Sequence, residues 1–134
     1  MSNQIQPSVF LRRVLMADAL VSAVVGVVMA LGAAALQGPL GLPNSLLMLA
    51  GVALFPYAAY VLWLARRSAV PRAAVWVPIV LNIGWAIECL FIVFGGGASP
   101  TLLGEAFIAV QVVTVLVFAE LEFVGLSRRS EAPV

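Results

Sequence analysis

Four long apolar runs dominate the pattern of hydrophobic and polar positions along the chain. They cover residues 10–36, 44–65, 73–94 and 101–126, and short polar or Gly/Pro-containing breaks separate them. Each run is long enough to cross a bilayer, which takes roughly 20 residues of α-helix. Because backbone groups in lipid must be hydrogen-bonded within their own segment, the pattern predicts an all-α membrane protein. We expect a bundle of four transmembrane helices forming a single domain, 1–134.

The composition argues against a soluble globular protein. Of the 134 residues, 63% are hydrophobic and 10% are charged, whereas soluble domains carry about 25% charged residues. The first run follows two arginines and ends in GAAALQG (32–38), so a cleaved signal peptide is an alternative. Its apolar stretch is longer than the roughly 7 to 15 residues of a signal core, and Asp18 interrupts it. We therefore interpret this run as a transmembrane helix.

The charges are distributed asymmetrically. All seven basic residues are arginines, and they flank the start of the first run, the second connection and the end of the fourth run: Arg12, Arg13, Arg66, Arg67, Arg72, Arg128 and Arg129. The connections 37–43 (QGPLGLP) and 95–100 (GGGASP) carry no charge. Because basic residues stay on the cytoplasmic side, we expect both termini to be cytoplasmic. The expected location is the bacterial cell inner membrane, as a multi-pass protein.

Residue types with catalytic or ligating chemistry are scarce. The chain has no histidine and one cysteine, Cys89, so haem, zinc and copper sites of the usual kinds are not expected. The sequence has no Ser/His/Asp set, no paired carboxylates on one helix face at mid-depth and no glycine-rich phosphate loop before a helix. Since topology explains the arginines, nucleic acid is not an expected partner. We predict no metal, no cofactor and no catalytic residue.

Small residues recur at every fourth position of the first run. Asp18, Ser22, Gly26, Ala30 and Ala34 fall on one helix face. Rows of small residues let membrane helices approach closely, which is how they gain packing energy in lipid. The stripe predicts a helix contact face. A homo-oligomer or a larger membrane complex is the expected partner besides the lipid bilayer.

Polar residues of three runs lie at comparable depth near the middle of the membrane. They are Tyr57 on the second run, Asn82 and Trp85 on the third, and Gln111 and Thr114 on the fourth. Hydrogen bonds among them would hold the helices together, contributing about 0.5–2 kcal/mol each. The alternative is a polar pocket between helices that holds a small amphipathic ligand. The sequence leaves both interpretations open.

The acidic residues fall into two groups by depth. Glu88 lies roughly six residues inside the uncharged end of the third run, far from every arginine. It is either a proton-carrying group or a side chain that reaches the outer water layer. Asp18, Glu120 and Glu122 lie toward the arginine-rich end. We expect them to form ion pairs at the membrane interface, with partners among Arg12, Arg13, Arg67 and Arg128.

Prolines and polar stretches predict how the runs are bounded. Pro39 and Pro43 are expected to stop and restart the chain around 37–43. Pro56 and Pro78 each remove one backbone hydrogen bond inside a helix. Residues 1–9 and 127–134 are expected to form short frayed tails.

Three segments carry a resemblance to a known group of proteins. They are RRVLMADALVS (12–22), PRAAVWVPIVLNIGW (71–85) and the run from TLLGEAFIAVQ to AELEFVGL (101–126). Their combination resembles an uncharacterised family of small bacterial four-helix integral membrane proteins, over nearly the whole chain. The resemblance implies the four-helix architecture and carries over no activity or catalytic residue.

The expected function is non-catalytic. We predict a structural or accessory subunit that packs against other membrane helices through the stripe on the first run. The alternative is a small proton-coupled transporter or lipophilic-ligand binder that uses an intramembrane polar layer of Glu88, Asn82, Trp85 and Gln111. An enzyme is a third and weaker interpretation. The sequence does not specify the ligand, the partner or the oligomeric state.

Overall fold

Between residues 4 and 131, the computed structural model contains four long helices and two short strands, with residues 128–131 described by their backbone alone. The helices are α1 (Val9–Leu40), α2 (Asn44–Arg66), α3 (Arg72–Phe94) and α4 (Leu102–Glu131), and the strands are β1 (Gln4–Ile5) and β2 (Val70–Pro71). Each helix is long and apolar enough to span a membrane, over Leu102–Ser127 in α4. The predicted all-α architecture with four span-length helices is confirmed.

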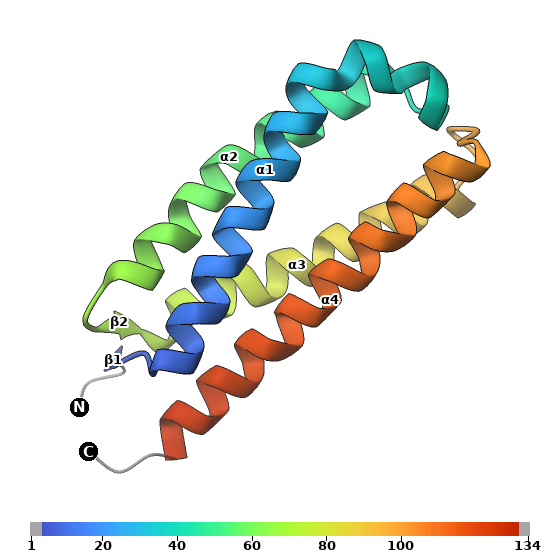
Figure 1. Ribbon diagram of the computed structural model, residues 1–134. Helices are drawn as coiled ribbons and strands as arrows, with labels where there is room; N and C mark the ends of the chain where they lie inside the picture. Colours follow the sequence, from blue (N-terminus) through green and yellow to red (C-terminus); the bar gives the residue numbers. More distant parts are fainter. Residues whose placement is uncertain (1–3, 132–134) are drawn as a thin grey trace.

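The helices form two antiparallel hairpins, α1–α2 and α3–α4 (Figure 1). Contacts are most extensive within each hairpin, α1 also packs along α4, and α2 touches α3 at few points. The hairpins are therefore joined mainly through α1 and α4. We call the end with both termini and the 67–71 connection the arginine end, and the opposite end with the 41–43 and 95–101 connections the loop end.

The N-terminal segment pairs with the α2–α3 connection, so the expectation of a frayed tail is wrong for residues 4–9, while residues 1–3 lie outside the described part. β1 and β2 are antiparallel, with Gln4 opposite Pro71 and Ile5 opposite Val70. Val70 is fully buried, and Ile5 packs against the same core. Burial of these apolar side chains offsets the conformational entropy that frays most chain ends.

α1 extends to Leu40, four residues beyond its predicted end, and contains Pro39 in its last turn. Gly41 ends the helix in the left-handed conformation at φ 67°, and its N–H donates to the Gln37 carbonyl at 2.9 Å. The backbone N–H of Thr101 donates to the Leu40 carbonyl at 3.0 Å, and its hydroxyl donates to the Pro39 carbonyl at 2.6 Å. α1 continues past the predicted stop because Thr101 satisfies carbonyls that its last turn leaves free.

In two more hydrogen bonds between elements, the acceptor is a backbone carbonyl that has no donor within its own helix. Pro78 has no N–H for the carbonyl of Ala74, four residues earlier, and the Tyr60 hydroxyl of α2 donates to that carbonyl at 2.7 Å. The carbonyl of Ala65, in the last turn of α2, accepts from Arg12 Nη1 at 3.2 Å. These bonds tie α2 to α3 and α1 at the arginine end.

The apolar interior has two clusters, one toward each end of the molecule. The arginine-end cluster contains Leu11, Leu15, Val61, Leu64, Val70, Val75, Ile79 and Leu126. The loop-end cluster contains Met29, Ala33, Leu40, Leu42, Leu47, Leu54, Cys89 and Ile108. Many large apolar side chains instead face outward, and Leu31, Phe94 and Leu102 are among the most exposed. Such an outer surface is suited to lipid.

The small-residue stripe of α1 packs against α2 of the same chain over most of its length. A Cβ added to Gly51 of α2 would lie 2.6 Å from the Ala30 nitrogen, and one added to Gly26 would lie 3.0 Å from the Gly51 carbonyl oxygen. Asp18 and Ser22 are also buried, whereas Ala34 is exposed. The close helix approach that the stripe predicts is therefore observed inside the chain.

Candidate functional site

A buried network of polar side chains joins all four helices in the arginine-end half of the molecule. Asp18 Oδ2 on α1 accepts from the Tyr57 hydroxyl of α2 at 2.6 Å and from Asn82 Nδ2 of α3 at 3.2 Å. Asp18 Oδ1 accepts from the Ser22 hydroxyl at 3.3 Å. Asn82 Nδ2 also donates to Glu122 Oε1 of α4 at 3.2 Å. We call Asp18 and Glu122 the carboxyl pair.

The carboxyl pair is fully enclosed. Asp18 is 1% exposed and Glu122 is 0% exposed. The two groups adjoin, and both accept from the single Asn82 nitrogen. Glu122 Oε2 is buried without a hydrogen-bond partner among the described residues. Leaving such an oxygen unpaired costs about 1–3 kcal/mol, more for a charged group.

The expectation that Asp18 and Glu122 form ion pairs with arginines is wrong for the side chains that the structure describes. Asp18 bonds only within the polar network, and Arg12 donates to the Ala65 carbonyl instead. The side chains of Arg128 and Arg129 lie outside the described residues. The physical reason is that α1 packs along α4 with both carboxyl groups turned toward the interior.

Glu122 is the functional candidate that sequence reasoning missed. Asp18 follows Arg12 by six positions, and Glu122 precedes Arg128 by six. At 1.5 Å per residue, both carboxyl groups therefore lie about 9 Å inside the arginines. The sequence places both groups toward the arginine-rich end, where arginine partners are expected, and their equal depth is the signal that the two carboxyl groups could meet each other.

Three cavities between the hairpins follow one another from the loop end to Asp18, and Glu122 lines none of the three. The first has a volume of about 260 Å³ and is lined at the loop end by Leu42 and Phe107. The second, of about 230 Å³, is lined by Asp18, and the third, of about 210 Å³, by Tyr57. Trp85 lines all three. Neighbouring cavities share lining residues, and each is a little smaller than the usual small-molecule site of roughly 300–1,000 Å³.

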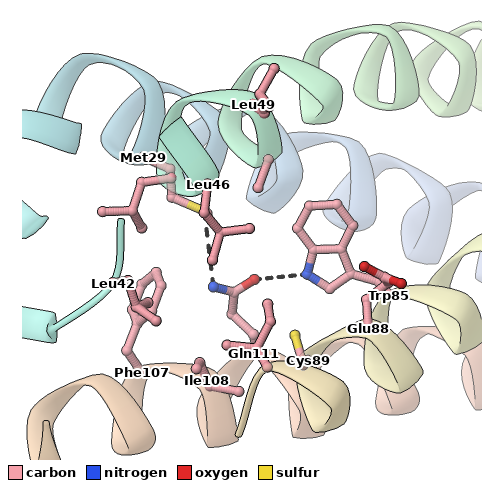
Figure 2. A pocket seen from close by; sticks show the side chains of 13 residues that line it. Met29, Leu42, Leu46, Leu49, Trp85, Glu88, Cys89, Phe107, Ile108 and Gln111 are labelled. Atoms are coloured by element: carbon pink, nitrogen blue, oxygen red, sulfur yellow. Dashed lines mark hydrogen bonds between the residues drawn. The ribbon is translucent and has the colours of Figure 1, made fainter. Parts of the chain in front are cut away.

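Trp85 and Gln111 form the polar centre of the first cavity. Trp85 Nε1 of α3 donates to Gln111 Oε1 of α4 at 2.8 Å, and Gln111 Nε2 lies 3.9 Å from Met29 Sδ of α1 (Figure 2). The side chains around them are mostly apolar and come from all four helices. The pair therefore holds two polar groups at a fixed position inside an apolar space.

The predicted mid-membrane polar residues form two groups at different depths. Tyr57 and Asn82 belong to the network around the carboxyl pair, whereas Trp85 and Gln111 bond to each other nearer the loop end. Thr114 lines the second cavity, between the two groups. Glu88 lines the first cavity with an exposed side chain and lies apart from the carboxyl pair.

The described part of the chain contains no cluster of metal-ligating side chains. No three His, Cys, Asp or Glu side chains between residues 4 and 127 come together closely enough to hold an ion. Comparisons of the chain with protein-family models, curated proteins and solved structures found no match. The functional argument therefore depends on the geometry of the cavities and the carboxyl pair.

Proposed function

We propose that this chain is a multi-pass protein of the bacterial inner membrane that binds a small lipophilic molecule between its two helical hairpins. Both termini are cytoplasmic in this proposal, because the arginines lie at that end. The observation that carries it is the series of cavities running from the loop end to Asp18. Apolar walls with a few fixed polar groups are the usual composition of a small-molecule site. No catalytic step is part of the proposal.

The cavities reach the lipid-facing surface where α2 and α3 separate. Leu49 of α2 lines the first cavity and is 71% exposed, and Leu81 of α3 lines the third and is also exposed. A molecule dissolved in the bilayer can therefore enter sideways between these helices. Since lipid tails are as apolar as the cavity walls, discrimination among ligands comes from the polar groups, here Gln111 and the Asp18 network.

The accessory-subunit role expected from the sequence depended on the α1 stripe as a surface for other proteins. Gly26 and Ala30 contact α2 of the same chain, and Asp18 and Ser22 are buried. Of the five stripe residues, Ala34 alone is exposed. The small residues of the stripe thus explain how α1 packs against α2. They no longer provide a reason to expect a partner subunit.

The test is purification of the tagged protein from its native membrane, followed by mass spectrometry of the small molecules and proteins that co-elute. Ala50→Phe places a ring in the first cavity, and Ala59→Phe places the same ring on the exposed face of the same helix. We expect wild type and Ala59→Phe to retain a lipophilic molecule. Ala50→Phe is expected to lose most of it, because the cavity is filled.

Two results would contradict the proposal. One is equal retention of the same molecules by Ala50→Phe and Ala59→Phe, which would show nonspecific association with the outer surface. The other is a stoichiometric protein partner with no retained small molecule, which would restore the accessory role. Circular dichroism and size-exclusion chromatography of the three proteins control for misfolding.

A further inference from the structure

We propose that the cavity takes a lipophilic organic cation, whose positive charge is held by the carboxyl pair Asp18 and Glu122 in exchange for a proton. This inference rests on the proposed function, because the apolar part of the cation would occupy the cavities described above. It adds the chemical class of the ligand and the group that recognises it.

The first argument is the unbalanced charge of the carboxyl pair. Asp18 and Glu122 adjoin inside the protein, share one neutral amide donor from Asn82, and have no described arginine beside them. Two like charges in a buried site repel strongly, and one added positive charge relieves that repulsion. Ionised groups inside a membrane protein usually mark a path for a substrate, an ion or a proton.

The second argument is the unpartnered oxygen of Glu122. Its side chain is completely buried, and Oε2 has no hydrogen-bond partner in the described part of the chain. The other oxygen accepts from Asn82, whose amide nitrogen also donates to Asp18, so the enclosed Glu122 adjoins the Asp18 carboxyl that lines the second cavity. A buried acceptor left free in this way shows that the carboxyl pair lacks one proton or one positive charge among the described side chains.

The groups facing the pair come from every helix. Asp18 and Ser22 belong to α1, Tyr57 to α2, Asn82 to α3 and Glu122 to α4. Apart from the two carboxyls, Tyr57 is the titratable member, and its hydroxyl donates to Asp18 at 2.6 Å. Tyr57, Ser22 and Asn82 supply hydrogen-bond donors but no positive charge, so among the described side chains nothing balances the pair, and in the proposed exchange a proton or a ligand takes that role.

The shape and lining of the second cavity favour an organic cation over a metal ion. Asp18 lines this cavity together with the aromatic rings of Trp85, Phe107 and Phe118. Aromatic faces attract ammonium groups, by about 0.5–2 kcal/mol each. The volume of about 230 Å³ suits a small ammonium compound. A bare metal ion would need a cage of oxygen ligands, whereas Asn82 turns its nitrogen toward both carboxyl groups.

The exchange conserves charge. In the proposed exchange, the carboxyl pair of the empty cavity shares one proton and carries a single negative charge. When a monovalent cation binds, this proton leaves to water and the cation takes over its charge. The net charge of the site is the same before and after, so each cation bound releases one proton.

The test uses a charged probe and its uncharged isostere. Benzyltrimethylammonium and neopentylbenzene have the same shape. The first has a positively charged nitrogen where the second has a neutral carbon. Binding of each labelled probe is measured to the protein in lipid nanodiscs, with empty nanodiscs subtracted, and proton release is recorded in weakly buffered solution. The variants are Asp18→Asn and Glu122→Gln, with Glu120→Gln as the matched control, because Glu120 is exposed on the same helix as Glu122.

We expect wild type and Glu120→Gln to bind the cation with release of one proton per cation. Asp18→Asn and Glu122→Gln should bind it at least about tenfold more weakly, because a buried charge loses its partner. All four proteins should bind neopentylbenzene equally, which also shows that the variants fold.

The outcomes separate this inference from the proposed function. Neopentylbenzene binding with no gain for the cation, or equal cation binding by the carboxyl variants, would overturn the inference alone. Proton release caused by sodium ions, and not by the organic cation, would also overturn it. Failure of the protein to bind either probe above empty nanodiscs would count against both proposals.

Discussion

At the scale of single residues, three of the hydrogen bonds between elements that end on a backbone carbonyl do so where a helix leaves that carbonyl without a donor. Pro78 deprives the Ala74 carbonyl of its usual partner, and Tyr60 of the neighbouring hairpin supplies the replacement at 2.7 Å. Thr101 serves the last carbonyls of α1 in the same way. The interior of a bilayer has no water to bond a free carbonyl, so a carbonyl there needs a donor from another part of the protein.

The pairing of Tyr60 with Pro78 can be tested by a double-mutant cycle. Tyr60→Phe is expected to lower the free energy of unfolding by about 1 kcal/mol, because the Ala74 carbonyl loses its donor. In a Pro78→Ala background the cost should be smaller, because the backbone N–H at position 78 can donate to that carbonyl. Unfolding in mixed micelles measures all four corners. The same cost in both backgrounds would show that the two residues are not coupled.

At the scale of the helices, glycines determine how closely α1 and α2 approach. Gly26 and Gly51 face each other, and neither position has room for a methyl group without movement of backbone atoms. Close approach replaces the hydrophobic effect as the source of packing energy between helices in lipid. The α1–α2 hairpin is accordingly the most extensively packed pair in the molecule.

Gly51→Ala is expected to destabilise the protein by about 1–3 kcal/mol, because the added methyl group overlaps the α1 backbone. Gly84→Ala is the matched control in α3, since a Cβ there meets nothing within 4 Å. The control should be neutral or slightly stabilising. Thermal unfolding of both variants in the same detergent provides the comparison. Equal melting temperatures would contradict the close approach at Gly51.

At the scale of the whole molecule, charge and packing divide the protein into two ends. The described arginines and the β1–β2 pair lie at the arginine end, and the uncharged connections lie at the loop end. The two hairpins are joined mainly through α1 and α4, so the cavities open between α2 and α3. The proposed ligand site therefore extends from the loop end toward the carboxyl pair.

The proposed orientation predicts which loops are reached from outside the cell. In a Cys89→Ala background, Ser99→Cys at the loop end should react with a membrane-impermeant maleimide in intact spheroplasts. Ser68→Cys, in the α2–α3 connection, should react only after lysis. Both serines are exposed, so the two variants control for each other. Labelling of Ser68→Cys before lysis would reverse or mix the proposed topology.

Part of the candidate site could be predicted from the sequence. Depth along each helix follows from counting residues inward, and this singled out Tyr57, Asn82, Trp85 and Gln111 as buried polar residues. Counting did not show which of them meet, because a helix turns about 100° per residue and small rotations change the neighbour that a side chain faces. Asp18 and Glu122 were both assigned arginine partners because of their depth, which does not reveal that the two side chains face each other.

By itself, the sequence determined that the chain forms four helices of membrane-spanning length and which ends carry the positive charge. Length, apolar content and charge are properties of single segments, so no knowledge of their neighbours is needed. Only the tertiary structure decided that Asp18 and Glu122 share one amide donor, and that cavities lie between the hairpins from the loop end to Asp18. These features depend on how four helices are rotated and packed against one another, which involves residues up to 104 positions apart in the sequence.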